Sequence, residues 1–503
     1  MKSLKKNVFI TLIFTSVLLF FTQVSAQRTL DLTLDTVIRL TLDQSYAKLH
    51  LDLDKKMMDL DYKDLTAYKR GTVATMDLFD PELNYHKSYY NYYNSNDVLK
   101  SYELDSYTGL RIIQPVNLLD SQIEIRNYIR TMKMGGKLSH LNNKNYYIYS
   151  NVSYTQPLFK KNLRKLNIRS KKLNIEYDDL NFLTDWIGRI TDAKYYYYSL
   201  LETSLKNDLF DSKLSILNDI EGISETLAQQ DPLRNQDTEY IQLEKNNLMG
   251  NMSFNKIEVE NIEEYLIYSL RLRDIDNLNI EPEIELVRVP IDIEDALEKT
   301  VNLNPEIRSK LIQSKIFEVS LNISERHNKP LQIGLQLLYN LSNSESEFDR
   351  VFKDQNRSAT ARITANLYLW DWGTRKISVD KQRVRLENYN LVSEETNDRL
   401  RSETAKEINT YQVNQELAFT LQAALESART NTQNGIERYR NGEINIYDLM
   451  QIVNRYYELE LLYAETYVMY KNSLSEISFL TFYDYEENIS LEEKYNLKRR
   501  VIN

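Results

Sequence analysis

The sequence contains no cysteine, and it has only eleven glycines and eight prolines among its 503 residues. The lack of cysteine excludes disulfides and thiolate-bound metals. So few glycines leave little material for loops that cradle phosphates, and no GxGxxG, GxSxG, HExxH or P-loop pattern occurs. The four histidines are scattered and form no paired motif; they are His50, His86, His140 and His327. We therefore expect no enzyme activity, no metal and no cofactor.

The charge balance and the hydropathy exclude two further classes of protein. A net charge of −10 gives no support to nucleic-acid binding. A charged fraction of 27% and a mean hydropathy of −0.52 argue against a helical membrane protein. One apolar run, Val8–Phe21, follows the lysines of Met1–Lys6 and precedes the small residues of Val24–Ala26. This pattern is typical of a secretory signal peptide, so we expect residues 1–26 to be removed and the mature chain to begin at Gln27.

Two long stretches of the chain lack proline, which disrupts helix interiors. These stretches can hold two long helices, Lys160–Gln229 and Arg375–Arg438. At 1.5 Å per residue the second helix would span roughly 95 Å, so it needs neighbours along its length, as in a coiled coil or a tube. Its apolar seam is thin and follows 4-3-4 spacing at Leu417, Leu421, Ala424 and Ala428. A solvated structural coiled coil, secreted and without a channel, is therefore an alternative to a tube.

Two segments in the second half, Leu331–Leu337 and Ala359–Leu369, alternate between apolar and polar residues with a period of two. One face of this pair carries Leu331, Ile333, Leu335, Leu337, Ala361, Ile363, Ala365 and Leu367. The other face carries Gln332, Gln336, Arg362, Thr364 and Asn366. In a membrane β-barrel the first set would face lipid and the second set would face the lumen. Such strands argue against a coiled-coil protein without a channel.

The chain also repeats itself, because short segments of the first half align in order with segments of the second half. The aligned pairs are Leu34–Ile38 with Ile293–Leu297, Gln156–Phe159 with Leu367–Trp370, and Glu239–Gln242 with Asp448–Gln451. Each half reads as helix, strands, long helix, tight turn and second helix. We expect the first repeat at 27–284, the second at 285–482 and a C-terminal tail at 483–503.

The first repeat is the longer one, and its excess lies in the strand region. We expect strands there over about 80–157, with an added hairpin at about 109–130. In the second repeat we expect strands at about 331–341 and 359–369, a long helix at about 375–438 and a helix at about 444–480.

Several segments together resemble the TolC-type outer-membrane efflux proteins. Leu367–Val379 (LYLWDWGTRKISV) is similar to the family's passage from strand to helix, with Gly373 followed by a basic cluster. Tyr439–Leu461 is similar to the turn between the two helices of the family's second repeat. Asn304–Glu306 resembles the Asn-Pro opening of the family's repeats. The added hairpin and Tyr154–Phe159, a strand exit, look most like the Bacteroidetes branch of the family.

The resemblance implies a fold that is mainly α with a membrane β-barrel portion. It implies a homotrimer in the outer membrane of a Gram-negative bacterium, with four strands from each protomer in a shared twelve-stranded barrel and a periplasmic α-helical tunnel. The polar stretch Ser342–Arg357 would be an extracellular loop, and the added hairpin would lie either in the barrel or outside it. The chain would be the passive exit duct of a tripartite efflux system for small molecules, with a periplasmic adaptor, an inner-membrane pump and outer-membrane lipid as partners. The outer-membrane tunnel of a type I protein-secretion system is an alternative with the same fold.

The resemblance places a periplasmic entrance, or gate, near the second-repeat turn. Its residues would be Tyr439, Gly442, Asp448, Gln451, where the family has a second aspartate, and Glu239 from the first repeat. The family's arginine position falls on Ile444, which weakens a gate built on a salt bridge. Three copies of Asp448 with Glu239 would form an anionic constriction that favours cations. In the alternative, the two acids complement the macrodipoles at helix starts.

Overall fold

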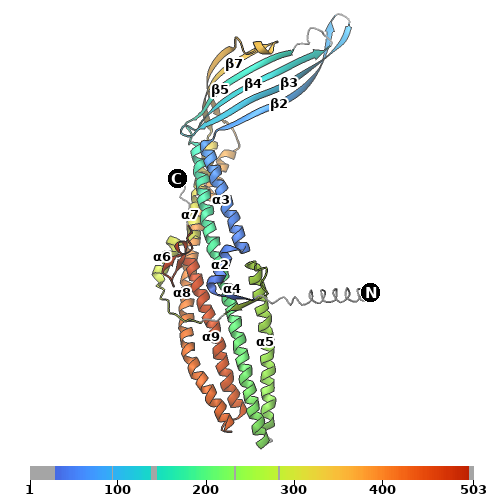
Figure 1. The fold of residues 1–503 in the computed structure, drawn as a ribbon. Coiled ribbons are helices and arrows are strands. Elements are labelled where there is room, and N and C mark those ends of the chain that lie inside the picture. The colour runs from blue at the N-terminus through green and yellow to red at the C-terminus, as the bar shows by residue number, and fades with distance from the viewer. Residues whose placement is uncertain (1–28, 93–94, 137–143, 232–233, 281–283, 498–503) are drawn as a thin grey trace, which may run out of the picture. The chain divides into compact units, whose positions relative to one another are not determined.

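The structure is a computed structural model that describes residues 29–92, 95–136, 144–231, 234–280 and 284–497 (Figure 1). The expected signal peptide and the last six residues of the expected tail lie outside the described residues, as do the side chains of 78–105 and 134–136. The chain divides into two compact units. The helical unit comprises Met1–Lys55, Asn181–Ile307 and Asn397–Arg499, and the sheet unit comprises Lys56–Leu180 and Arg308–Thr396.

The sheet unit contains one antiparallel sheet of six strands in the order β2-β3-β4-β5-β7-β8. The strands are β2 (Val73–Tyr92), β3 (Ser95–Val116), β4 (Ser121–Gly136), β5 (Lys144–Leu158), β7 (Leu331–Glu345) and β8 (Asn356–Leu367). Within one chain the sheet is open, because β2 and β8 are its two edges.

This sheet bears on two expectations about the strands. The structure places the expected hairpin at about 109–130 in the longer strands β3 and β4, which lie in one sheet with the other four strands. The expected loop Ser342–Arg357 is shorter than predicted, because the pairs Leu341↔Arg357 and Ser342↔Asn356 continue the β7–β8 ladder.

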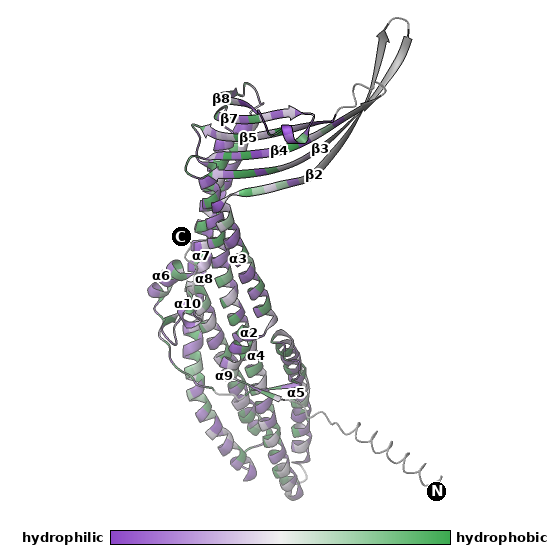
Figure 2. Ribbon diagram, turned by 45° about the horizontal axis from the view of Figure 1, so that its top comes forward, coloured by the Kyte–Doolittle hydropathy of each residue, from purple (hydrophilic) through white to green (hydrophobic). Residues whose placement is uncertain are grey.

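Directly paired residues of an antiparallel ladder share one face of the sheet, so the register assigns the faces. One row of paired residues crosses all six strands; it consists of Ala74, Ile112, Ile125, Val152, Tyr339 and Ala359. The next row lies on the opposite face; it consists of Thr75, Arg111, Arg126, Asn151, Asn340 and Ser358. We name these the apolar face and the polar face. Figure 2 shows the same alternation of hydrophobic and hydrophilic residues along the strands.

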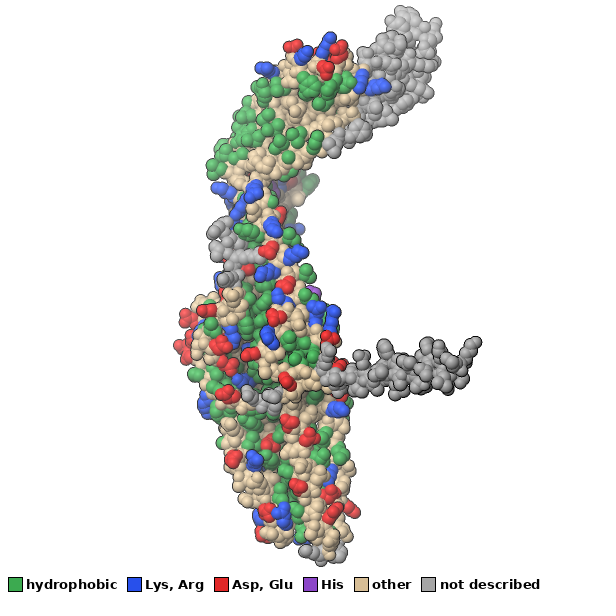
Figure 3. Space-filling view, in the orientation of Figure 1, with side chains coloured by type: hydrophobic (Ala, Val, Ile, Leu, Met, Phe, Trp, Pro, Cys, Tyr) green, Lys and Arg blue, Asp and Glu red, His purple; other side chains and the backbone are tan. Residues whose placement is uncertain are grey.

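The apolar face is exposed in a single chain. Met76 on β2 is 64% exposed and Ile363 on β8 is 72% exposed, although both side chains are hydrophobic. In the space-filling view, hydrophobic side chains gather over the sheet and charged side chains cluster at its upper rim (Figure 3). A surface of this kind normally marks a site that another molecule or a membrane covers.

The turn between β3 and β4 is fixed to three helix ends that lie within the sheet unit. Asp120 in this turn accepts a hydrogen bond from the Arg164 backbone N–H at 3.1 Å and forms an ion pair of 2.5 Å with Arg326. Asn117 donates to the Lys69 carbonyl at 3.1 Å, and Arg326 donates to the Lys161 carbonyl at 2.7 Å. The helices concerned are α3 (Tyr46–Arg70), α4 (Leu163–Gln230) and α7 (Pro305–His327).

The helical unit contains two long helical hairpins. The first joins α4 to α5 (Asn235–Ser269), and the second joins α8 (Thr374–Arg440) to α9 (Ile446–Thr481) (Figure 1). Polar contacts connect neighbouring helices: Lys245 on α5 pairs with Glu221 on α4, and Ser212 on α4 bonds to Tyr457 on α9 at 3.0 Å. Within the described residues, no helix is both long and apolar enough to cross a membrane.

The short elements of the helical unit also occur in two copies. Helices α2 (Leu34–Asp43) and α6 (Ile293–Leu303) both begin at a side-chain cap, from Thr33 and Asp292 respectively. Strands β1 (Thr29–Leu32) and β6 (Asn277–Ile280) pair in parallel.

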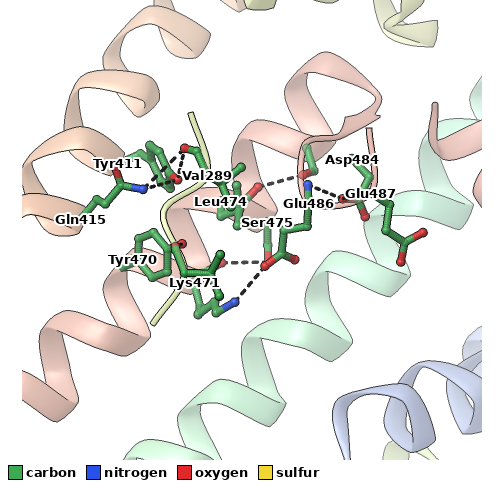
Figure 4. Close-up of polar contacts among 12 residues, drawn as sticks. Val289, Tyr411, Gln415, Tyr470, Lys471, Leu474, Ser475, Asp484, Glu486 and Glu487 are labelled. Atoms are coloured by element: carbon green, nitrogen blue, oxygen red, sulfur yellow. Dashed lines mark hydrogen bonds and ion pairs between the residues drawn. The ribbon is translucent and has the colours of Figure 1, made fainter. Parts of the chain in front are cut away.

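Two tyrosines on the long helices donate hydrogen bonds to the extended segment that precedes α6. The Tyr411 hydroxyl on α8 donates to the Val289 carbonyl at 2.7 Å (Figure 4), and Tyr470 on α9 donates to the Val287 carbonyl at 2.6 Å. Burial raises the pKa of Tyr411, so this hydroxyl stays protonated and continues to donate. In the same region the predicted seam of α8 is wrong at its first position: Leu421 is buried as predicted, but Leu417 is 38% exposed and Ala418 is buried instead.

Part of the expected C-terminal tail is structured. It forms β9 (Tyr483–Asp484), β10 (Ile489–Ser490) and α10 (Leu491–Lys494). Asp484 is buried and pairs with Lys494 at 2.5 Å, while Glu486 pairs with Lys471 of α9 at 2.8 Å (Figure 4).

The Asp120–Arg326 pair gives a first prediction. Asp120→Asn keeps the shape of the side chain and tolerates the positive φ of 54° at this position. It leaves the buried Arg326 without a carboxylate, so the free energy of unfolding should fall by about 3 kcal/mol. Urea unfolding of the purified protein in detergent, followed by circular dichroism, measures this change. Glu347→Ala removes an exposed pair with Arg350 and should cost less than about 1 kcal/mol; equal losses would contradict the assignment.

Candidate functional site

The turns that close the two helical hairpins carry most of the predicted entrance residues. Tyr439 lies in the last turn of α8 and is fully buried. Its hydroxyl donates to Asp237 Oδ2 at 2.9 Å, and Asp237 lies in the first turn of α5. This hydrogen bond joins the second hairpin to the first. Sequence reasoning selected Glu239 from this turn and missed Asp237, two residues earlier, because the repeat alignment pairs Glu239 with Asp448.

The electrostatics of the Tyr439 contact keep it intact over a wide pH range. Burial raises the pKa of Tyr439 to about 12, and the hydrogen bond to Asp237 acts in the same direction. A folded-state pKa above the ordinary value near 10 means that the neutral phenol is favoured. The contact is therefore fully formed at lower pH and is lost only as the pH rises through about 12.

Gly442 closes α8 in the left-handed region, with φ of +73°. Its N–H donates to the Tyr439 carbonyl at 2.9 Å, and the next N–H, from Glu443, donates to the Arg438 carbonyl at 2.8 Å. These two bonds form the usual glycine-terminated helix end. A side chain at this position would also approach Arg234 of the other turn, since an added Cβ would lie 3.5 Å from Arg234 Nη2.

The other three predicted entrance residues lie on exposed surface. Asp448 is in the first turn of α9, and its backbone N–H donates to the Asn445 side chain at 2.9 Å. Gln451 and Glu239 are exposed on α9 and α5. Within one chain Tyr439 contacts Asp237 and not Asp448, so the lumen role of Asp448 stays a prediction. The position of Asp448 in the first turn of α9 also suits an acid whose negative charge complements the positive end of the helix macrodipole.

The register of β7 and β8 brings the predicted barrel residues together in two sets. The eight apolar residues form the directly opposed pairs Leu331↔Leu367, Ile333↔Ala365, Leu335↔Ile363 and Leu337↔Ala361. The five polar residues form the pairs Gln332↔Asn366 and Gln336↔Arg362, with Thr364 opposite Gly334. Each set therefore occupies its own face, and the medium that each face meets stays a prediction.

The polar face continues over β3, β4 and β5 with charged and aromatic side chains. Glu124 accepts hydrogen bonds of 2.5 Å from both Arg111 and Arg126. The rings of Tyr107, Tyr128 and Tyr149 follow one another, with centroid distances of 6.3 and 5.0 Å. The alternation of Ile123, Ile125 and Ile129 with polar residues was the signal for this face, since their neighbours in sequence must point the other way.

A hollow of about 410 Å³ opens beside this network. It is lined by Asp77, Tyr107, Gly109, Leu110, Arg111, Arg126, Asn127 and Tyr128. Tyr128 lies against Gly109, where an added Cβ would come within 2.8 Å of the Tyr128 Cβ. An aromatic side chain opposite a strand glycine commonly covers the backbone that the glycine leaves bare.

Exposed aromatic residues mark the passages between strands and helices in the sheet unit. Trp370 and Trp372 follow β8, are largely exposed, and contact each other with a centroid distance of 5.4 Å. Phe159 follows β5 and is also largely exposed. The Arg375 guanidinium lies over the Tyr368 ring at 3.1 Å from its centroid. Aromatic rings of this kind are enriched where a barrel meets the boundary between lipid and water.

Comparison with solved structures identifies the fold. The outer-membrane channel OprN is 13% identical, with a TM-score of 0.65 and coverage of 89% of each chain. The CmeC outer membrane channel of Campylobacter jejuni is 12% identical, with a TM-score of 0.65 over 92% of this chain and 88% of that one. The open state of the MtrE outer membrane channel of Neisseria gonorrhoeae is 12% identical, with a TM-score of 0.61 over 89% of this chain and 88% of that one. No family model and no curated protein matches the sequence. The chain therefore has the TolC-type fold, and mainly helical structure is confirmed.

The contact between the two turns gives a second prediction. Tyr439→Phe removes the hydroxyl and leaves Asp237 without this donor, at a cost of about 1–2 kcal/mol. Backbone amides at the end of α8 and the start of α5 should then exchange hydrogen about tenfold faster, because local opening becomes easier. Mass spectrometry of deuterated peptides measures the rates. Tyr411→Phe removes a comparable hydroxyl far from the turns and should leave their exchange unchanged; unaltered exchange in Tyr439→Phe would show that this bond does not hold the turns together.

Proposed function

We propose that this chain is the outer-membrane exit duct of a tripartite efflux system. Three copies form a passive channel in the outer membrane of a Gram-negative bacterium, with a periplasmic extension, for the export of small molecules. A periplasmic adaptor and an inner-membrane pump are its partners, and the pump supplies the energy because this sequence has no P-loop. The fold shared with outer-membrane channels supports this proposal.

The observation that carries the proposal is the two-faced open sheet. Its apolar face is exposed from Met76 on one edge to Ile363 on the other, and its polar face carries paired charges such as Arg111 and Glu124. Such a sheet suits lipid on one side and water on the other. Open edges are not tolerated in lipid, because unpaired backbone groups there cost several kcal/mol each. Copies of the chain that close the sheet into a barrel remove these edges.

The helical unit supports an assembly of copies independently of the sheet. On the outward side of α5, the exposed residues Leu243, Gly250, Phe254 and Ile257 follow 7-4-3 spacing. On α8, Val413, Leu417 and Thr420 are exposed with 4-3 spacing. These are heptad positions, which helices use to pack against a neighbouring helix. In a ring of copies, α5 of one copy and α8 of the next would cover each other.

A third prediction tests the membrane assignment with two adjacent substitutions. Ile363→Arg places a charge on the apolar face and should cost about 2–4 kcal/mol if that face meets the middle of the lipid layer. Thr364→Arg, on the polar face, should be tolerated because it points to water. The readout is the amount of heat-modifiable trimer in the outer-membrane fraction, which should be high for the unchanged protein and for Thr364→Arg and low for Ile363→Arg. Equal amounts for both variants, or a soluble monomer without detergent, would contradict the proposal.

A fourth prediction concerns ion selectivity at the periplasmic mouth. If three copies of Asp448 line the lumen, the reconstituted channel should favour cations, and trivalent cations added from the periplasmic side should block it. Asp448→Ala should remove both effects while trimers persist. Glu443→Ala is the matched control, because Glu443 lies in the same turn and faces Arg438 at 3.5 Å. Unchanged ion selectivity in Asp448→Ala would mean that Asp448 only complements the macrodipole at the start of α9.

A further inference from the structure

We infer that all six strands of each chain belong to the barrel wall, so that three copies close an eighteen-stranded barrel in which β8 of one copy pairs with β2 of the next. This inference rests on the proposed trimeric channel and adds the number of strands and the pairing partners. A barrel with four strands from each chain would leave β2 and β3 outside the wall.

The ladder shows no interruption between β3 and β4, where a wall of four strands would end. The β3–β4 pairing runs from Ser101↔Gly136 to Val116↔Ser121, and the β4–β5 pairing runs from Gln122↔Thr155 to Lys133↔Lys144. A register shift lies between Asp77 and Asp80 in the β2–β3 pair. If β2 and β3 lay outside the wall, β3 would have to leave this ladder, which would separate Arg111 on β3 from Glu124 on β4.

Strands β2 and β3 also carry the same two faces as the rest of the sheet. Met76 on β2 and Leu110 on β3 are directly paired, exposed and apolar. Arg111 on β3 lies on the opposite face with Arg126 on β4. If β2 and β3 were surrounded by water, exposed apolar residues would gain nothing from sharing a face with Ile125 and Val152. They gain the burial of that surface when the same lipid covers all six strands.

The turn between β3 and β4 lies at the end of the sheet that connects to the helices. Asp120 is fixed there by Arg326 and by the N-terminal end of α4, and Asn117 is fixed by the end of α3. At that same end α3 leads into β2, and β5 leads into α4. Strands β3 and β4 therefore start from the same level as the strands that continue into helices, as strands of a barrel wall do.

The two open edges then have a defined partner. A long unpaired edge strand is a template for another strand, and a barrel removes both edges by closure. The edge strands β2 and β8 belong to the same two-faced sheet. When β8 of one copy pairs with β2 of the next, the apolar faces of both copies point to lipid and the polar faces point to the lumen. Because barrel diameter grows about linearly with strand number, eighteen strands give a lumen about 1.5 times as wide as twelve.

Disulfide cross-linking tests this pairing, since the sequence has no cysteine of its own. Thr75→Cys on β2 is combined, one at a time, with a cysteine on the polar face of β8, at Thr360, Arg362, Thr364 or Asn366. After oxidation of outer membranes, at least one of these pairs should give dimers and trimers linked between copies. The matched control replaces Met76 instead of Thr75. Its side chain lies one residue on, on the opposite face, and should not link to the same β8 positions.

A parallel series places the first cysteine on β4, as Arg126→Cys, with the same four β8 positions. Links between β4 and β8 of different copies would mean that the wall closes without β2 and β3; this result overturns the inference and leaves the trimeric channel intact. Heat-modifiable trimers that form no link in the β2 series also overturn it. Absence of trimers in the unchanged protein would instead contradict the proposed function. Each single-cysteine variant must form heat-modifiable trimers for its pair to count.

Discussion

The pairing of backbone groups in the sheet governs the rest of this molecule. A strand in lipid must satisfy every N–H and C=O by bonding to another strand, because hydrocarbon offers no alternative partner. Inside the six-stranded sheet the strands bond to each other, but the outer backbone groups of the edge strands β2 and β8 have no partner strand within the described part of one chain. The alternation of Ala74, Ile112 and Ile125 with Thr75, Arg111 and Arg126 gives the sheet an apolar side and a polar side, as lipid on one side and water on the other would require. The two together make an assembly of copies a physical requirement of the proposed membrane location.

The helical unit meets a different constraint, because its helices are too long to be stabilised by a compact core. Its buried side chains form separate clusters along α4, α5, α8 and α9, and polar contacts connect neighbouring helices. Tyrosine serves this arrangement because its ring packs and its hydroxyl reaches a backbone or carboxylate partner, as Tyr411 and Tyr439 do. Loosening one such contact should open one level of the helical unit and leave the other levels packed. The proposed entrance at the turns could then move while the rest of the helical unit stays rigid.

The sequence was most informative where a local pattern alone determines the structure. Strict alternation placed the residues of β7 and β8 on two faces, and the absence of proline marked α4 and α8. It was least informative where tertiary contacts decide: Tyr439 was selected, but its partner Asp237 follows from the packing of two hairpins. The added hairpin at about 109–130 was predicted from its alternation, but the sequence left open whether it continues the sheet, because the pairing of β3 with β2 and of β4 with β5 is a tertiary contact. The first position of the α8 seam was misplaced because Leu417 and Ala418 are both acceptable core residues, and only packing against the neighbouring helix decides which of them is buried.

Connectivity explains why the added hairpin needs its own anchor. At the helix-connected end of the sheet, β2, β5, β7 and β8 each continue into a helix, which fixes the strand end through the rest of that helix. Strands β3 and β4 join each other instead, so nothing in the covalent chain holds their turn in place. Side chains fix the turn instead, through the ion pair of Asp120 with Arg326 and the hydrogen bond from Asn117 to the end of α3. Two extra strands can thus widen a sheet without extra helices, provided that the turn between them is bonded to helix ends already present.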